Sequence, residues 1–552
     1  MSQPHHRDSV PSLLWPAGHD RSPGSAGISA QQSLDLGLDV LIRELDWDGR
    51  HSSQVRAVLL ALVADAEVIA YRQAIVAELA ADERLRDALA ALLPSLADLA
   101  QPRSAGWGQE SPLLLVPPRV SDLEHYVACI EALAAALGSE PDLRSAGLRG
   151  LRDYVAAVRA GEEFGALAAE LPSLREQLDR AASVTIGLNL DRALRPVAAT
   201  LVSINDEPFA GPRTLVQRLL SRSTPAARPG MTILRQIAER SPETDPLAHD
   251  LQQILNEVVQ PVAAALERYG RLQARPLAAL EPELAFMLGA IRFAQRRTAQ
   301  GLPTCLPTPT DREHLLAGAY NPGLAIQLAS APTDRQNGAS EPPVLNPIDF
   351  ELGRIVFLTG PNRGGKTTYL RAIGQNQVLF QAGVFVAAQQ ARMLPADAIL
   401  THFPPIEGVE PGGGRLDDEA RRMREMFAQA TPASVLLFNE PLTSTGEREA
   451  QSIAADVLRA LRLLGARTVY VTHLHALADD LATLNQGDGA TIVSWTAGVD
   501  SGDARTYLIR PGQPAARSHA ATIAEQQGIT FAQLMRQLAE RGVVRETGEP
   551  RT

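Results

Sequence analysis

The chain has 552 residues, of which 45% are hydrophobic and 21% are charged, and its formal net charge at pH 7 is −11. This length exceeds what one compact core accommodates, so two or more domains are expected, and no apolar run reaches the ~18 residues that a membrane span needs. The two cysteines, Cys129 and Cys305, have no CxxC spacing and no nearby His cluster, so they indicate neither a disulfide framework nor a zinc site. The acidic balance argues against a strongly basic protein that coats nucleic acid and leaves a local basic patch open.

The first 32 residues mix His, Pro, Ser and Gly. They lack both the apolar stretch of a secretory signal peptide and the Arg-rich amphipathic pattern of a transit peptide. We therefore expect residues 1–32 to form a disordered leader in a cytoplasmic protein that does not associate with membranes.

Residues 33–310 are expected to form a helical domain, because they are rich in Ala, Leu, Arg and Glu and poor in β-branched residues. Apolar residues recur at three- and four-residue steps, as at Val68, Tyr71 and Ile75, which predicts helices packed along shared apolar seams. One segment, residues 184–189, has strand character instead. It indicates either a short ribbon or a buried crossing within the helical domain.

Residues 311–552 change to short apolar runs that alternate with helical segments, which is typical of an α/β sheet. The clearest predicted strands are residues 355–358, 435–438 and 468–471. Each run ends at a polar residue, so functional side chains are expected at the ends of these strands. The predicted fold class is thus an all-helical domain followed by an α/β domain.

A glycine-rich loop follows the first of these strands. Residues 360–367 fit the pattern G-x-x-x-x-G-K-[ST] between a predicted strand and a predicted helix, a context in which backbone N–H groups converge on phosphate. We predict that this P-loop binds ATP, with Lys366 contacting the β- and γ-phosphates and the Thr367 hydroxyl ligating Mg²⁺. The predicted nucleotide-binding residues of the loop are Gly360, Pro361, Asn362, Arg363, Gly364, Gly365, Lys366, Thr367 and Thr368.

The strand at residues 435–438 leads into Asn439 and Glu440, where a P-loop ATPase needs an apolar strand that ends in acid. Asn439 stands where an aspartate is expected, and we predict that its uncharged amide takes part in binding Mg²⁺. Glu440 is the predicted general base for the attacking water. His473, which follows the strand at residues 468–472, is predicted to sense the γ-phosphate and is the second predicted catalytic residue.

A second glycine-rich segment, residues 408–414, precedes a predicted helix. A loop of this kind at a helix N-terminus binds anions, so Gly412 and Gly414 are predicted to complete the nucleotide site of a partner subunit. A surface turn without this function is the other interpretation, and the sequence leaves both open.

These residues resemble the MutS family of DNA mismatch-repair ATPases. Residues 359–371 are similar to the extended P-loop of that family, including the Pro-Asn inside it, and residues 383–388 resemble the segment that follows the P-loop helix. Asn346, within Leu-Asn-Pro-Ile-Asp at residues 345–349, matches the family's adenine-side asparagine.

The resemblance extends to both ends of the chain. Residues 71–73 resemble the start of the family's core and lever helices, and residues 507–512, Ser518 and residues 523–524 resemble its closing strand and helix-turn-helix dimerisation region. The resemblance implies a helical core and lever domain at 33–310 and an ABC-type P-loop ATPase domain with C-terminal dimerisation helices at 311–552. It also implies a homodimer with two composite ATP sites that acts on DNA alongside repair or recombination proteins.

The chain departs from the long members of the family in its mismatch-reading part. That domain would precede the helical core, where only residues 1–32 lie, and the sole Phe-x-Glu in the sequence is Phe438-Asn439-Glu440. We therefore expect a short member without that domain, which couples ATP binding and hydrolysis to DNA binding in mismatch repair or recombination control. The alternative, favoured by Asn439, is a nucleotide-regulated scaffold that binds a protein or RNA and hydrolyses ATP slowly or not at all.

Overall fold

The computed structural model describes most of the chain, with gaps. The described residues are 10–19, 21, 27–100, 112–138, 142–179, 183–190, 192, 196–207, 259–266, 268–269, 275–330, 341–404, 415–499, 505–513 and 527–541. They divide into two compact units: the first comprises Met1–Ala17 and Glu78–Ala285, and the second comprises Gly18–Ala77 and Phe286–Thr552. The chain passes between the units after Ala17, within α4 (Ala66–Ala81) and within α13 (Leu280–Ala299).

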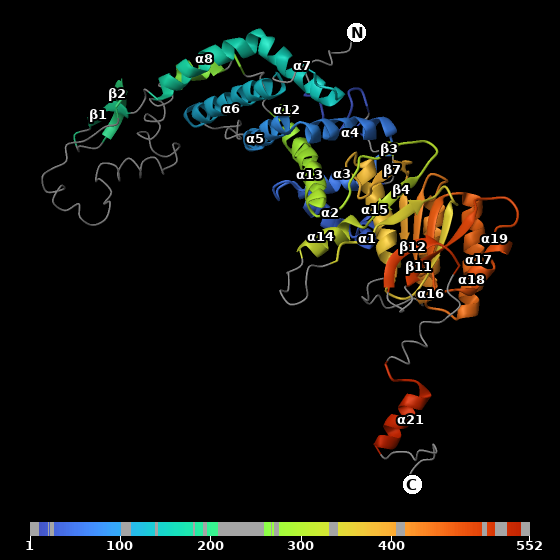
Figure 1. Ribbon diagram of the computed structural model, residues 1–552. Helices are drawn as coiled ribbons and strands as arrows, with labels where there is room; N and C mark the ends of the chain where they lie inside the picture. The colour runs from blue at the N-terminus through green and yellow to red at the C-terminus, as the bar shows by residue number, and fades with distance from the viewer. Residues whose placement is uncertain are drawn as a thin grey trace. The chain divides into compact units, whose positions relative to one another are not determined.

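The first unit is built mainly from helices (Figure 1). Its long helices are α5 (Glu83–Ala100), α6 (Pro112–Gly138), α7 (Ala146–Ala160) and α8 (Glu162–Asp179), with the short α12 (Arg275–Ala278) against α5. The predicted apolar seams are buried, as at Leu148 and Leu151 of α7 and Leu167 and Leu171 of α8. Helices whose apolar stripes face one another account for the packing of this unit.

The β-rich segment of the first unit is a ribbon. Strand β1 (Ser183–Leu190) pairs antiparallel with β2 (Pro196–Asn205), and the side chains of β1 are exposed or half-buried. Of the two interpretations of residues 184–189, the ribbon is therefore confirmed and the buried crossing is wrong.

The expectation of a disordered leader does not hold for its described residues. Leu13 and Leu14 are buried, and the carboxylate of Glu283 accepts hydrogen bonds from the hydroxyl of Ser12 at 2.8 Å and the backbone N–H of Leu13 at 2.6 Å. Farther along, Ser29 caps α1 (Ala30–Leu36) through a capping box. Two leucines in a polar, proline-containing stretch are too few to give a periodic signal, so the sequence did not reveal this contact.

The second unit contains two sheets. The six-stranded sheet has the order β12-β11-β6-β10-β9-β8, all parallel except β12, and the smaller sheet has the order β3-β7-β4-β5. The large sheet comprises β6 (Ile355–Thr359), β8 (Ile399–His402), β9 (Val435–Asn439), β10 (Arg467–Val471), β11 (Ile492–Val499) and β12 (Arg505–Pro511), and the small one β3 (Thr308–Pro309), β4 (Leu315–Ala319), β5 (Asn346–Asp349) and β7 (Gln390–Met393). The three strands predicted from the sequence are β6, β9 and β10.

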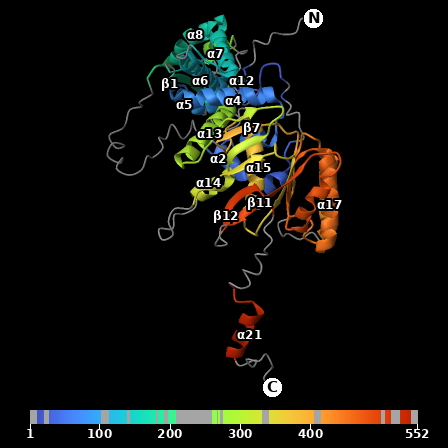
Figure 2. The ribbon, with the colours of Figure 1, turned by 45° about the vertical axis from the view of Figure 1, so that its right-hand side comes forward.

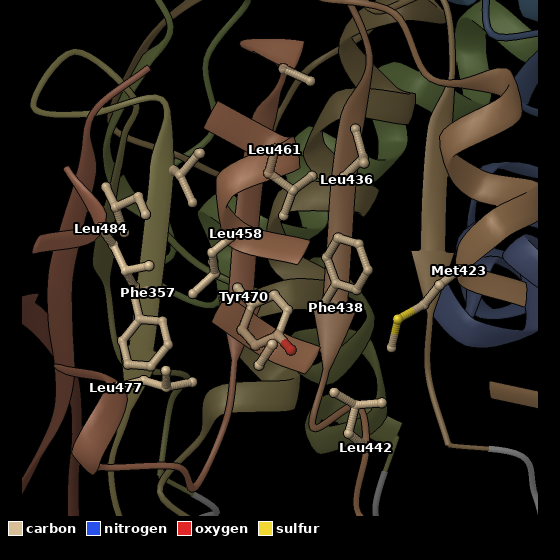
Figure 3. Packing of buried hydrophobic residues seen from close by; sticks show 14 of the residues in the cluster. Phe357, Met423, Leu436, Phe438, Leu442, Leu458, Leu461, Tyr470, Leu477 and Leu484 are labelled. Atoms are coloured by element: carbon tan, nitrogen blue, oxygen red, sulfur yellow. The ribbon is translucent and has the colours of Figure 1, made fainter. Parts of the chain in front are cut away.

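Helices cover both faces of the large sheet (Figures 1 and 2). Helix α15 (Lys366–Gln381) packs on one face, and the other is covered by α16 (Arg415–Gln429), α17 (Glu447–Leu464), α18 (Ala476–Asp479) and α19 (Leu481–Leu484). Figure 3 shows the core of the second face, where Phe357, Tyr470 and Phe438 from neighbouring strands meet leucines of α17. A sheet buried on both faces explains why its strands read as continuous apolar runs.

The helices nearest the N-terminus also belong to the second unit. Helices α1, α2 (Leu38–Leu45) and α3 (Ser52–Leu60) pack with α14 (Pro322–Ser330) and α15, so the units do not divide at the residue 310 expected from the sequence. The carbonyl of Asp35 accepts a hydrogen bond from Arg371 at 2.8 Å, and that of Leu36 accepts one from Gln375 at 2.7 Å. The contact arises because α15 is buried on all sides and needs partners for its buried side-chain amides.

Helix α21 (Phe531–Glu540) completes the described elements. Within the described part of the chain, no helix has the length and apolar character required to cross a membrane.

Candidate functional site

The glycine-rich loop connects β6 to α15, as the sequence predicts. Gly360 and Gly365 have positive φ angles of 137° and 91°. A Cβ on Gly360 would lie 2.7 Å from the Cβ of Ala497, and one on Gly364 would lie 2.9 Å from the carbonyl oxygen of Pro361. Only glycine fits these positions, which leaves the backbone amides at the N-terminus of α15 open to an anion.

Lys366, the first residue of α15, turns back into this loop. Its Nζ donates hydrogen bonds to the carbonyl oxygens of Gly360 and Pro361, each at 3.0 Å. The side chain is buried, and burial lowers the pKa of Lys366, an effect that the nearby carboxylate of Glu440 opposes. The ammonium group is thus held at the mouth of the loop by neutral acceptors that an anionic ligand can replace.

Glu440 follows β9 in a left-handed backbone conformation with φ of 50°. Its Oε1 lies 3.5 Å from Nζ of Lys366 and 2.8 Å from Nε2 of His473. The hydrogen bond from His473 lowers the pKa of Glu440, and the charge of Lys366 adds to this shift. Because β9 and β10 are parallel neighbours, the residues that follow them emerge at the same edge of the sheet.

The next pair of side chains joins the start of α15 to the end of β9. The Thr367 hydroxyl donates a hydrogen bond of 3.1 Å to Oδ1 of Asn439. Oxygen ligands suit Mg²⁺, so the two oxygens fit the ion by type, although neither carries a charge.

Asn346 of β5 joins two strands from different sheets. Its Nδ2 donates to the carbonyl of Tyr507 at 3.0 Å, and its Oδ1 accepts from the backbone N–H of Ile509 at 2.7 Å. Both groups of the amide are therefore used to hold β12. Tyr507 has a positive φ of 56°, and its Cδ1 would lie 3.4 Å from a Cβ on Gly365.

A pocket of about 490 Å³ opens beside the loop. This volume lies in the range of ligand-binding pockets. Of the residues predicted from the sequence, it is lined by Asn346, Arg363, Gly364, Gly365, Lys366, Thr367, Thr368 and Glu440.

Other predicted site residues do not line this pocket. His473 contacts the pocket-lining Glu440, and Asn439 contacts the pocket-lining Thr367. Gly360, Pro361 and Asn362 belong to the glycine-rich loop but do not line the pocket. Gly412 and Gly414 lie outside the described residues, as do Ser518 and residues 523–524 of the predicted dimerisation region.

The sequence did not identify the apolar end of the pocket. There the lining comes from Tyr320, Leu324, Leu328, Pro343, Val344 and Tyr507, with the amide of Asn321 beside them. These residues come from separate segments, and only Tyr507, in the predicted closing strand, belongs to a segment that the sequence singled out. The only sequence signal for the other residues was that they lie in or next to the predicted elements on either side of the glycine-rich loop.

Comparison with known proteins identifies two domains in the chain. Residues 64–300 match the MutS2 N-terminal domain, and residues 356–529 match MutS domain V. The DNA mismatch repair protein MutS of Chlorobium limicola is 31% identical over 223 residues, which are 40% of this chain and 25% of that protein. For MutS of a Synechococcus strain the identity is 32% over 240 residues, 42% of this chain and 24% of the relative.

A more distant relative is the DNA mismatch repair protein msh-3 of Neurospora crassa, which is 27% identical over 278 residues, 47% of this chain and 23% of that protein. The chain spans a quarter or less of the length of the curated relatives it matches. The two matched domains lie in the order in which the sequence placed a helical part and an α/β part. The chain belongs to the MutS family.

Proposed function

We propose that the chain is an ATP-dependent DNA-binding protein of the MutS type, which couples ATP binding and hydrolysis at a dimer interface to DNA binding in mismatch repair or recombination control. The observation that carries the proposal is the chain of contacts beside the glycine-rich loop, where Glu440 lies 3.5 Å from Lys366 Nζ and 2.8 Å from His473 Nε2. A lysine at the start of the helix that follows such a loop, with a carboxylate and an imidazole from the ends of two neighbouring strands beside it, matches the needs of a P-loop ATPase.

Each of these side chains has a distinct role in the proposed reaction. Lys366 exchanges the loop carbonyls for phosphate oxygens when a nucleotide enters. Glu440, kept ionised by its depressed pKa, orients the attacking water and accepts its proton. His473 holds Glu440 in position and contacts the terminal phosphate.

The proposed metal is Mg²⁺, held by Thr367 and Asn439. When bound, it supplies positive charge to the phosphate oxygens. The hydrogen bond between Thr367 and Asn439 keeps the two oxygens together before the metal enters.

DNA as the partner and a dimer as the active form are supported by kinship. The similar proteins from Chlorobium, Synechococcus and Neurospora are each named as DNA mismatch repair proteins. We propose that Gly412 and Gly414 of one copy complete the nucleotide site of the other, and that the protein acts in the cytoplasm with repair or recombination proteins.

The test is a DNA-binding titration at several salt concentrations, with and without ATP, on homoduplex, mismatched and junction DNA. Contacts to phosphate make affinity fall steeply with salt, by about 0.9 log unit per log unit of salt for each phosphate neutralised. We expect ATP to change the affinity for at least one of the three DNA forms. If no DNA form binds in a salt-sensitive manner, DNA binding is rejected while the ATPase assignment stands.

A second candidate is a nucleotide-regulated scaffold with slow or no hydrolysis. The pairing of Thr367 with the neutral amide of Asn439 favours it, because a missing carboxylate weakens metal binding. Measured ATP turnover in the presence of Mg²⁺, above that of the Glu440→Gln variant, would reject the scaffold.

A further inference from the structure

The glycine-rich loop carries a cation that none of its neighbours engages. Arg363 lines the pocket, is exposed, and has a positive φ of 59°. It forms no hydrogen bond or ion pair with any residue that the structure describes. The other cation of the pocket, Lys366, is engaged by two carbonyls and by Glu440.

The backbone at Arg363 makes this residue an unusual choice. A left-handed conformation disfavours side chains with a Cβ, and arginine there costs conformational free energy that glycine would avoid. No hydrogen bond or ion pair within the described part of the protein offsets this cost. A ligand in the pocket is the partner that would offset it, and a guanidinium group matches the geometry of phosphate oxygens.

At the proposed metal-binding end of the pocket, a negative charge that P-loop ATPases usually have is missing. Asn439 places a neutral oxygen 3.1 Å from the Thr367 hydroxyl, where P-loop ATPases use an aspartate. This end of the site therefore offers a divalent cation one carboxylate fewer, while Arg363 supplies a second positive charge beside Lys366 for a phosphate chain. Glu341, an exposed carboxylate, lines the same pocket. The charge of Glu440 is shared with two other groups, because its Oε1 lies 2.8 Å from Nε2 of His473 and 3.5 Å from Nζ of Lys366.

From these observations we propose that Arg363 binds the phosphate chain of the nucleoside triphosphate directly and takes over part of the charge neutralisation that Mg²⁺ supplies in other P-loop proteins. This inference rests on the proposed nucleotide site and adds a property to it. The chain holds ATP with little dependence on divalent cations, whereas Mg²⁺ remains required for turnover. In this proposal, the positive charge of Arg363 compensates for the weaker binding of Mg²⁺ at the neutral Asn439.

Calorimetric titration of the full chain with ATP tests the pair, once in saturating MgCl₂ and once in EDTA. We expect the wild-type dissociation constant to rise by less than about tenfold in EDTA. Arg363→Gln should weaken binding in EDTA by about tenfold to a hundredfold, the value of one charge-assisted hydrogen bond, and by only a fewfold in MgCl₂. Arg363→Lys is the matched control and should retain most of the affinity in EDTA.

Asn439→Asp tests the role of Asn439. It should make ATP binding more dependent on Mg²⁺. The new carboxylate should tighten binding in MgCl₂ and weaken it in EDTA, so the ratio of the two dissociation constants should increase. Thermal unfolding of each variant without nucleotide confirms folding, which is expected for Arg363→Gln because Arg363 is exposed and forms no hydrogen bond or ion pair with the described residues.

Two results would overturn the inference. One is a wild-type affinity that falls by about a hundredfold or more in EDTA, and the other is an identical MgCl₂-to-EDTA ratio for wild type and Arg363→Gln. Failure of the proposed function gives a different pattern, in which the wild type binds no ATP in either buffer. Lys366→Ala is the reference for that result, because this variant should bind ATP neither in MgCl₂ nor in EDTA.

Discussion

The side chain of Glu440 lies between the two other groups on which the proposed chemistry depends. Its left-handed backbone, with φ of 50°, is uncommon for a residue with a side chain. The hydrogen bond from the N–H of Glu440 to the carbonyl of Val471, at 2.9 Å, holds that backbone against β10. The strained conformation thereby orients the carboxylate toward Lys366 and His473 instead of along the strand.

The first prediction concerns the carboxylate itself. Glu440→Gln should retain ATP binding, because the amide preserves shape, and should reduce turnover by about a hundredfold to ten-thousandfold, since it cannot accept a proton. Phosphate release measures turnover, and calorimetry measures binding. Equal turnover in wild type and variant would refute the role of Glu440 as general base.

A second prediction follows from a buried histidine at the end of β8. Burial lowers the pKa of His402 to about 4, and the charge of Arg422 adds to the shift. A histidine with a depressed pKa takes up a proton on unfolding, so its contribution to stability is complete above the ordinary value near 6.5 and declines as the pH falls toward 4. Urea unfolding at several pH values should show stability falling between pH 6.5 and 4.

The variant His402→Gln isolates this contribution. It should lose part of the slope of stability against pH in that interval, whatever its effect on stability at neutral pH. An unchanged slope would mean that other groups cause the pH dependence.

At the scale of elements, close packing of helices depends on single glycines. A Cβ on Gly289 of α13 would lie 1.8 Å from the carbonyl oxygen of Leu45, at the end of α2. The two backbones therefore touch at this point, and no side-chain movement can relieve the overlap.

Gly289→Ala should destabilise the protein by about 2 kcal/mol or more, because overpacking outweighs the gain of up to ~1 kcal/mol in helix propensity. Gly165→Ala in α8 is the matched control, since nothing lies within 4 Å of the added Cβ. It should stabilise by about 0.5–1 kcal/mol. Denaturant midpoints for both variants measure the contrast, and a loss of stability in both would contradict the packing argument.

The elements also show what sequence reasoning can and cannot reach. Strands β6, β9 and β10 were predicted because burial on both faces leaves continuous apolar runs, and the loop before α15 was predicted because its chemistry requires glycine and lysine in a fixed order. The attachment of α1 to α15 was not predicted. It depends on Arg371 and Gln375 reaching carbonyls more than three hundred positions away, which no local pattern encodes.

The same limit applied within the candidate site. Lys366, Glu440 and His473 were identified because each has a motif position, and the structure brings them together. The conformation of Arg363 and the placement of Tyr507 beside the loop depend on backbone angles that the sequence does not express. Asn346, predicted to lie beside the base, lines the pocket, but the two hydrogen bonds that tie its amide to the backbone of β12 could not be read from the sequence.

At the scale of the whole molecule, the proposed dimer gives a prediction about mass. If two copies close around ATP, the Glu440→Gln variant should accumulate as a dimer in ATP, because hydrolysis no longer opens the interface. Light scattering coupled to gel filtration should show the mass rising from the 59.2 kDa of one chain toward twice that value. Lys366→Ala, which should bind no ATP, should stay unchanged, and a shift in that variant would show that association is independent of the nucleotide.

The two pieces of the second unit are separated along the chain by Glu78–Ala285 of the first unit. Ribosomes therefore release α1, α2 and α3 long before α15 exists, and at ~5–20 residues per second the interval of about 300 residues lasts roughly 15–60 s. During that time, apolar side chains such as Leu36 and Leu45, fully buried in the finished protein, lack their final partners. We therefore expect the chain cut after Ala285 to give two poorly soluble fragments and not two folded domains, because each fragment lacks part of the second unit.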